Sequence, residues 1–170
     1  MTESNSTRGF HVAPGAGEEL WSVGDTFTLK ATAATTGGTL TFFELAVPPR
    51  TGPPPHIHHH EDEALYVLQG QLTVRLGDRT FAAGPGTFAF LPKGVVHGYA
   101  NAGPETVRLV SVATPAGIEG FFREAGWPAR PGEQAPPPGP EEMRKAAAAA
   151  PRYGIEVPPG AAAPADPPSR

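Results

Sequence analysis

The sequence predicts an all-β protein, and three observations support that prediction. Short runs rich in Val, Thr, Leu and Phe recur about every ten residues, and Gly, Pro or Asn–Asp turn signals separate them. No long amphipathic helix lies between these runs, so a parallel α/β sheet is disfavoured. Twelve of the 22 prolines lie in residues 128–170, which separates a folded body from a Pro/Ala-rich tail. The body is therefore predicted to be an antiparallel sandwich or barrel.

Eight strands are predicted in the body. Gly77 and Asp78 lie between two of them, and Gly70 lies between two others, so the local prediction is a meander of hairpins. The predicted strands are 27–33, 39–47, 64–69, 71–76, 79–82, 87–91, 95–101 and 106–113.

Two short helices are predicted after the strands. The first, 115–125, carries Ile118, Phe121 and Phe122 at i, i+3 and i+4, which is one apolar stripe. The second begins at Pro140 and ends before Pro151. The predicted organisation is an N-terminal arm (1–19), a barrel (20–114), a helical extension (115–157) and a disordered tail (158–170).

Composition and charge exclude several classes of protein. The 13 Lys and Arg residues against 17 Asp and Glu give a net charge of −4, so a nucleic-acid partner is not expected. No run approaches the ~20 apolar residues of a membrane span, and the first ten residues do not resemble a signal peptide. The chain has no cysteine, so disulfides and thiolate sites are excluded. We expect a cytoplasmic protein that binds a small molecule and neither nucleic acid nor membrane.

Four of the six histidines fall within five residues, as His56, His58, His59 and His60. On a strand, His56 and His58 project from the same face, and an acidic triplet follows them directly. Imidazole and carboxylate groups in this arrangement form a metal-ligand pattern that needs no cysteine. The same alternation also permits a competing triad of His56, His58 and His60.

Two segments of the chain resemble the two sequence motifs of the cupin family. The first is GPPPHIHHHEDE, from Gly52 to Glu63, followed after six residues by Gly70. The second is GTFAFLPKGVVHGYAN, from Gly86 to Asn101, and it agrees at every fixed position of the motif. One departure lies at Arg50, where the family has a glycine six residues before the first histidine.

Within the cupins, the chain is similar to small single-domain proteins of the quercetin 2,3-dioxygenase-like type. The similarity extends past the barrel to the segments GIEGFFREAG and RYGIEV. The resemblance implies a jelly-roll barrel of two antiparallel sheets with short C-terminal helices. It also implies a homodimer, for which we expect the N-terminal arm (9–23, with Trp21) or an outer sheet face to provide the contacts.

The resemblance implies that His56, His58, Glu63 and His97 hold one divalent transition metal, which is Fe, Ni, Mn, Co, Cu or Zn. Glu63 is preferred to Glu61 because six residues separate it from Gly70. Glu63 is also the expected catalytic base, whereas Glu61 and His60 are expected to be dispensable.

Aromatic residues flank the expected ligands. By alternation, Tyr99 and Asn101 share a face with His97, so they are candidates for substrate binding together with Phe43. The apolar side chains predicted to form the core or line the cavity are Phe43, Leu45, Val67, Phe88, Phe90 and Tyr99.

Three functions follow from these residues. The first is a metal-dependent dioxygenase of a small enolisable or flavonol-like aromatic substrate, with Glu63 accepting the substrate hydroxyl proton. The second is an isomerase, lyase or cyclase that uses the metal as a Lewis acid and consumes no O₂. The third is a non-enzymatic small-molecule-binding protein that retains the ligands.

Overall fold

A computed structural model describes residues 8–160 and confirms the prediction of an all-β, antiparallel architecture. The strands are β1 (Glu18–Ser22), β2 (Asp25–Ala31), β3 (Thr41–Val47), β4 (Ile57–His58), β5 (Asp62–Gln69), β6 (Leu72–Leu76), β7 (Arg79–Ala83), β8 (Phe88–Leu91), β9 (His97–Ala100), β10 (Val107–Thr114), β11 (Trp127–Pro128) and β12 (Ile155–Glu156). The helices are α1 (Ala33–Thr36), α2 (Glu119–Ala125), α3 (Pro140–Ala149) and the 3-10 helix η1 (Ala150–Tyr153).

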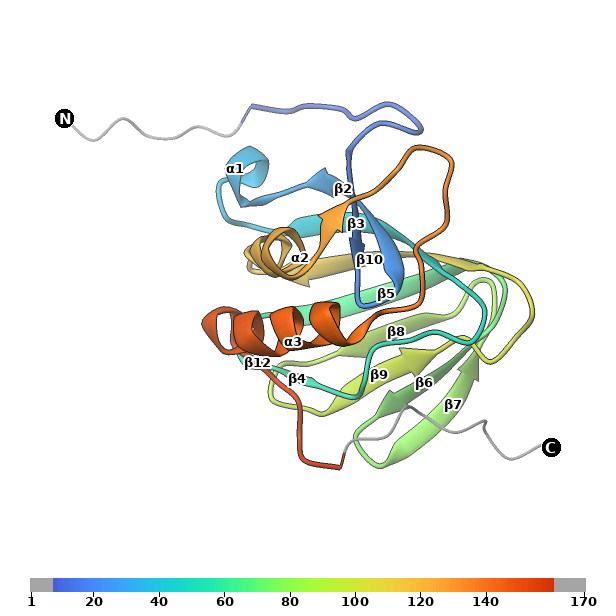
Figure 1. Cartoon of the computed structure of the whole chain (residues 1–170). Coiled ribbons are helices and arrows are strands. Elements are labelled where there is room, and N and C mark those ends of the chain that lie inside the picture. Colours follow the sequence, from blue (N-terminus) through green and yellow to red (C-terminus); the bar gives the residue numbers. More distant parts are fainter. Residues whose placement is uncertain (1–7, 161–170) are drawn as a thin grey trace.

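The strands form two layers that enclose the core (Figure 1). One layer is a seven-stranded sheet in the order β11-β1-β2-β3-β10-β5-β8. The other contains the three-stranded sheet β7-β6-β9 and the pair β12-β4. An isolated bridge between His56 and His97 joins these two smaller sheets. The arrangement is the jelly-roll barrel that the sequence predicts.

The predicted hairpin meander is wrong at one of its two turns. Gly77 and Asp78 do connect the paired strands β6 and β7. Gly70, however, leads from β5 in the large sheet to β6 in the small one, so this turn crosses between the layers. Gly70 has φ of 80°, and a Cβ there would lie 2.8 Å from Val107 Cγ2, so the crossing requires a glycine.

Each of the eight predicted strands is present, with ends shifted by a few residues. The first predicted strand ends early because α1 begins at Ala33, and the sequence pattern missed β1 and the two-residue strands β4, β11 and β12. Trp21, expected as an exposed dimer contact in the arm, is instead buried in β1 opposite Trp127. Residues 161–170 of the predicted tail lie outside the described part of the chain.

Helix α2 packs its apolar stripe into the barrel, as the sequence predicts. Ile118, Phe121 and Phe122 are all buried. The Phe122 ring stacks on Phe27 at 4.0 Å between centroids and meets Phe43 edge-on at 5.3 Å. Aromatic contacts of this kind add to the free energy of burial, so α2 is fixed against β2 and β3.

The C-terminal extension continues from α2 to the edge of the small layer. Helix α3 lies beside α2 at one side of the barrel, and η1 leads from it to β12 (Figure 1). Strand β12 pairs with β4, placing Ile155 opposite His58. None of the helices within residues 8–160 is long and apolar enough to cross a membrane.

Arg50, where the sequence departs from the cupin motif, lies in the segment that leads into β4. Arg50 adopts φ of 61°, a left-handed conformation that glycine tolerates better than arginine. Gly52 follows with φ of 155°, and a Cβ there would lie only 2.2 Å from the Tyr99 carbonyl oxygen. The chain therefore uses Gly52 for its close approach to β9.

The outer face of β5 and β8 carries exposed apolar side chains. Phe88 and Phe90 point outward, with Phe88 63% exposed, so the expectation that they form the core or line the cavity is wrong. Tyr66 lies directly opposite Phe88 in the strand register, and Leu68 follows on the same face of β5. Contiguous exposed apolar patches of this kind mark interaction sites.

We predict that the chain is a homodimer through this outer face, because a two-fold interface joins the same patch of both subunits. Phe88→Lys should convert the dimer to monomers, since it places a charge in the apolar contact. Phe10→Lys, in the N-terminal arm, is the matched control and should leave the dimer intact. Light scattering at micromolar concentration measures the mass. A native chain with the mass of one subunit would contradict the prediction.

Candidate metal centre

A short antiparallel bridge places His56 and His97 opposite each other. The backbone N–H of each residue donates to the carbonyl oxygen of the other, both at 2.8 Å. His97 is the first residue of β9, and His56 directly precedes β4. Side chains of directly opposite residues project on the same side of a sheet. Both imidazoles therefore enter the space between the two layers.

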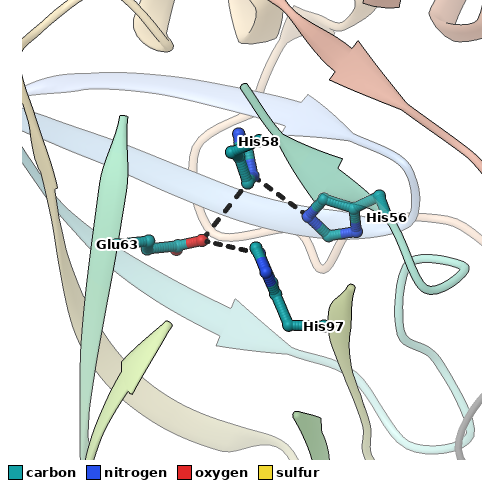
Figure 2. A group of neighbouring side chains, drawn as sticks. All are labelled: His56, His58, Glu63 and His97. Carbon is teal, nitrogen blue, oxygen red and sulfur yellow. Dashed lines mark hydrogen bonds and ion pairs between the residues drawn. The ribbon is translucent and has the colours of Figure 1, made fainter. Parts of the chain in front are cut away.

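His58 and Glu63 complete the group from β4 and β5. His58 follows His56 by two residues, so strand alternation places both imidazoles on one face, as the sequence predicts. Glu63 belongs to the seven-stranded sheet, where it lies opposite Leu91 and Ala113. Its carboxylate therefore approaches the imidazoles from the other layer. Figure 2 shows the four side chains pointing toward one another.

The four donor atoms converge on a small volume. One ligand atom from each residue lies within 4.8 Å of the others. The Nε2 atoms of His56 and His58 are 3.1 Å apart. Glu63 Oε2 lies 3.7 Å from His58 Nε2 and 3.6 Å from His97 Nε2 (Figure 2). The structure thus brings together the four residues that the cupin resemblance assigns as ligands.

The second ring nitrogen of each histidine has its own acceptor. His56 Nδ1 is 2.9 Å from the Pro54 carbonyl oxygen, and His97 Nδ1 is 2.9 Å from that of Val95. His58 Nδ1 is 2.6 Å from Glu61 Oε1. A carbonyl or carboxylate acceptor requires a proton on Nδ1, which in a neutral imidazole leaves a lone pair on Nε2. In their neutral forms the three imidazoles therefore direct Nε2 lone pairs toward the same small volume as the Glu63 carboxylate.

The electrostatics of the group favour ionised Glu63 and neutral His56. Burial, together with the neighbouring His58 and His97, lowers the pKa of His56 from 6.5 to about 3. Burial raises the pKa of Glu63, but contact with His97 and the charge of His58 outweigh it and bring the pKa to about 2. Burial lowers the pKa of His58, while Glu61 and Glu63 raise it by more.

The group fits a divalent transition metal. Among residues 8–160, His97 Nε2 is one of three buried side-chain nitrogen or oxygen atoms that make no hydrogen bond. A buried lone pair without a donor is unfavourable, and a cation at the centre of the group would satisfy it. Three imidazoles and one carboxylate are ligands that Fe, Ni, Mn, Co, Cu and Zn all accept. The site could therefore bind one such ion.

The competing triad of His56, His58 and His60 does not form. His60 is exposed, and its ring packs over Gly154 outside the barrel. His59 is also exposed, and its Nε2 lies 2.8 Å from Glu156 Oε2. Strand β4 ends at His58, so alternation does not continue to His60. The pairing of β12 with β4 thus holds both histidines away from the group.

Two residues that support the ligands were missed by the sequence reasoning. Glu61, expected to be dispensable, is buried and holds His58 Nδ1. Ser111 on β10 donates a 2.6 Å hydrogen bond to Glu63 Oε1, which directs the other oxygen toward the imidazoles. The position of Glu61, three residues after His58, could have indicated its contact with that histidine. No local pattern in the sequence indicates the role of Ser111, because only the pairing of β10 with β5 brings it to Glu63.

The group opens on a cavity of about 220 Å³ inside the barrel. His56, His58 and Glu63 form part of its wall, and most of the remaining lining is apolar. Phe43 and Tyr99 line this cavity, which is consistent with their expected contact with a substrate. Side chains of α2, α3 and β12 close one side of the cavity.

Asn101, expected beside the substrate, has a structural position instead. It is buried outside the cavity lining, and its Nδ2 donates to the carbonyl oxygens of Val47, Pro48 and Glu105. Its Oδ1 accepts from the backbone N–H of Gly103. These bonds use the whole amide to join the end of β3 to the segment between β9 and β10, so Asn101 cannot also face the cavity. Alternation from His97 fails here because β9 ends at Ala100.

Asp25 is a cavity residue that the sequence pattern did not single out. It is only 1% exposed, and its carboxyl group accepts hydrogen bonds from the hydroxyls of Tyr99 at 2.7 Å and Thr51 at 3.3 Å. Burial raises the pKa of Asp25 from 3.8 to about 7, against the opposing effect of those two hydroxyls. The Tyr99 pKa is raised well above its ordinary value by burial and by Asp25.

Comparison with known proteins agrees with this geometry. Residues 43–113, which run from β3 to β10 and include all four ligand candidates, match the family model for the cupin domain. The barrel has the cupin fold. Over 73 residues the chain is 33% identical to quercetin 2,3-dioxygenase of Bacillus subtilis (strain 168). That match covers 43% of this chain but only 21% of the length of the Bacillus enzyme.

Solved structures share the fold of the cupin domain. KdgF from Halomonas sp. superposes with a TM-score of 0.57 at 19% identity, over 66% of this chain and 98% of KdgF. An RmlC-like cupin from Shewanella frigidimarina gives a TM-score of 0.56 at 18% identity, over 66% and 97% of the two chains. A predicted oxalate decarboxylase from Thermotoga maritima gives 0.57 at 17% identity, over 63% and 99%.

Glu61→Gln should weaken metal binding, because it replaces the carboxylate that orients His58 and favours its Nδ1 proton. Loss of such a partner lowers metal affinity by about 10- to 100-fold. Calorimetric titration of the apo protein with Zn²⁺ measures the effect. The matched control is Glu156→Gln, which alters the exposed partner of His59 and should leave the affinity unchanged. Equal Zn²⁺ affinity in native protein and Glu61→Gln would show that Glu61 does not support the ligands.

The free energy of unfolding of Asp25→Asn should increase relative to that of the native protein as the pH rises from about 4 to 7. Asp25 ionises near pH 7 when folded and near 3.8 when unfolded, so in this window only the unfolded chain loses the proton. The free energy of unfolding of the native protein therefore falls relative to that of the variant, by on the order of 4 kcal/mol over the whole window. Denaturant unfolding of both proteins at pH 5 and pH 8 measures the difference. A difference that stays constant with pH would contradict the prediction.

Proposed function

We propose that this cupin domain is a metal-dependent enzyme, and specifically a dioxygenase of a small enolisable or flavonol-like aromatic substrate. The observation that supports the proposal most is the convergence of three Nε2 lone pairs and the Glu63 carboxylate at the wall of an apolar cavity. A metal group enclosed by protein on all sides would suggest a structural role. Here the wall of the cavity leaves a side from which a substrate can approach.

Glu63 is the residue best placed to accept a proton. Ser111 holds Oε1, so Oε2 is the oxygen directed to the centre of the group. Glu63 is ionised at neutral pH, as a base must be before it acts. A substrate hydroxyl that approaches the group from the cavity would have Oε2 as its nearest proton acceptor. A bound divalent ion would polarise the substrate oxygens and, if redox-active, allow reaction with O₂.

The apolar walls support this chemistry by excluding water. Phe43 and Phe122 are packed against each other at the cavity wall, and Ile118 lies beside them in the lining. An enolate formed by loss of the hydroxyl proton is protected there from reprotonation by bulk water. The walls, which include Phe43 and Tyr99, also provide contact area for a flat substrate.

The likeness to the Bacillus quercetin 2,3-dioxygenase favours the dioxygenase over the two other functions. It is a partial likeness, because the matched 73 residues span 21% of that enzyme. An isomerase, lyase or cyclase would use the same site without O₂. A binding protein would take up the ligand without turnover. Consumption of O₂ with a turned-over substrate distinguishes the dioxygenase from both.

Glu63→Gln tests the proposal. The variant keeps an oxygen near the centre but cannot accept a proton at neutral pH, so metal should be partly retained while turnover falls by ~10² or more. An O₂ electrode with a panel of hydroxy-carbonyl and catechol substrates measures turnover, and elemental analysis measures metal content.

His60→Ala is the matched control, because its side chain lies outside the barrel, and it should change neither quantity. Turnover of a panel substrate without O₂ uptake would contradict the dioxygenase and favour the isomerase, lyase or cyclase. Full activity in Glu63→Gln would contradict the assignment of Glu63 as the base.

A further inference from the structure

The cavity contains a second group of polar side chains, separate from the four ligand candidates. Ser22 and Asp25 lie in its wall, at the turn that joins β1 to β2. Ser22 is completely buried, and its hydroxyl makes no hydrogen bond among the described residues. Asp25 is 1% exposed. These two side chains interrupt a lining that is otherwise mostly apolar.

The turn that presents these two residues is held from several sides. Glu142 of α3 accepts a 2.6 Å hydrogen bond from the backbone N–H of Val23, which has φ of 52°. Tyr99 and Thr51 donate to the two oxygens of Asp25. Ser22 and Asp25 are therefore fixed in place before any ligand arrives. A fixed polar group binds a ligand with less loss of conformational entropy than a mobile one.

Ser22 and Asp25 have unused hydrogen-bonding capacity. A carboxyl group offers about four lone-pair positions, and the Asp25 oxygens receive two hydroxyl donors. The Ser22 hydroxyl can both donate and accept. A buried hydroxyl without a partner is unfavourable, so an occupant that supplies the missing hydrogen bond is favoured at this point of the wall.

Tyr99 relates this polar pair to the ligand candidates. It follows His97 by two residues on β9, so their Cα atoms are about 6.6 Å apart and both side chains enter the barrel. The Tyr99 hydroxyl then reaches Asp25, on the far layer. The two polar groups thus lie in different parts of the same cavity wall.

The volume of the cavity limits the size of a ligand that could lie between the polar pair and the four ligand candidates. An apolar cavity of about 150 Å³ holds benzene. At about 220 Å³, this cavity admits one ring with a few substituents, and the three-ring skeleton of a flavonol exceeds it. The narrow volume therefore favours the small enolisable substrate over the flavonol-like one.

We propose that the substrate is a single-ring compound with two oxygens at one end, directed to the ligand group, and a neutral hydroxyl at the other, bound by Ser22 and Asp25. This inference rests on the proposed function, because it takes the ligand group as the reactive end. A neutral hydroxyl suits the pair better than an ammonium group, since burial disfavours the charged carboxylate that an ammonium would need. The raised pKa of Asp25 agrees with this preference.

Binding of three catechols to the Zn²⁺-loaded protein under anaerobic conditions tests the proposal. The probes are 4-methylcatechol, 3,4-dihydroxybenzyl alcohol and 3,4-dihydroxybenzylamine, which share the chelating end and differ at the other. By calorimetry, the alcohol should bind about tenfold more tightly than the methyl compound, as one added hydrogen bond implies. The amine should bind no more tightly than the alcohol.

Ser22→Ala should reduce the preference for the alcohol to about twofold or less, without weakening 4-methylcatechol and without lowering the melting temperature. The matched control is Thr26→Ala, next to Asp25 but outside the cavity lining, which should keep the full preference. The flavonol quercetin should bind more weakly than the alcohol.

The outcomes separate this inference from the function on which it rests. If the catechols bind but the alcohol has no advantage, or if Ser22→Ala keeps that advantage, the hydroxyl subsite is overturned and the proposed function stands. If the amine or quercetin binds more tightly than the alcohol, the proposed substrate class is overturned and the proposed function stands. If none of the chelating probes binds the Zn²⁺-loaded protein, the proposed function fails together with the inference.

Discussion

The architecture depends on one electrostatic constraint, which is that four electron-pair donors face one another in a buried space. Each imidazole has its Nδ1 committed to an acceptor, so in the neutral state the Nε2 lone pairs of His56, His58 and His97 converge with the carboxylate of Glu63. In that state the arrangement is repulsive without a cation. Several elements hold it in place nonetheless: the His56–His97 bridge joins the small sheets, and Ser111 fixes Glu63 from the opposite layer. The fold thus provides a preorganised position for a positive charge.

The C-terminal extension beyond the barrel forms part of the cavity wall. Helix α2 contributes the Phe122 ring that closes the cavity over Phe27 and Phe43, and α3 secures the turn carrying Ser22 and Asp25 through Glu142. Strand β12 pairs with β4 beside His58, so the last segment of the described chain also supports the ligand group. The barrel therefore carries the four ligand candidates, whereas the extension closes one side of the cavity.

Features that depend on neighbouring residues were predictable from the sequence, whereas features that depend on which strands pair were not. Strand alternation over Phe42–Leu45 or Leu65–Leu68, and the motif spacing around His56 and His97, are local, so the strands and the grouping of four ligand candidates were predictable. The crossing at Gly70 and the outward direction of Phe88 depend on which strands pair, which local patterns do not determine. Ser111 reaches Glu63 only through the long-range pairing of β10 with β5. Asp25 contacts Tyr99, and Val23 contacts Glu142, only because distant parts of the chain pack together. Asn101 was misplaced because strand β9 ends one residue before it.

Elemental analysis of protein purified without an affinity tag tests the central claim most directly, with His97→Ala and His59→Ala prepared in parallel. His97 contributes a buried Nε2 that has no hydrogen-bond partner, whereas His59 is exposed and paired with Glu156. We predict about one transition-metal ion per chain in the native protein and in His59→Ala, and a loss of that ion in His97→Ala. Native protein that remains metal-free after incubation with each of the six candidate ions, or His97→Ala that retains a full equivalent, would contradict it.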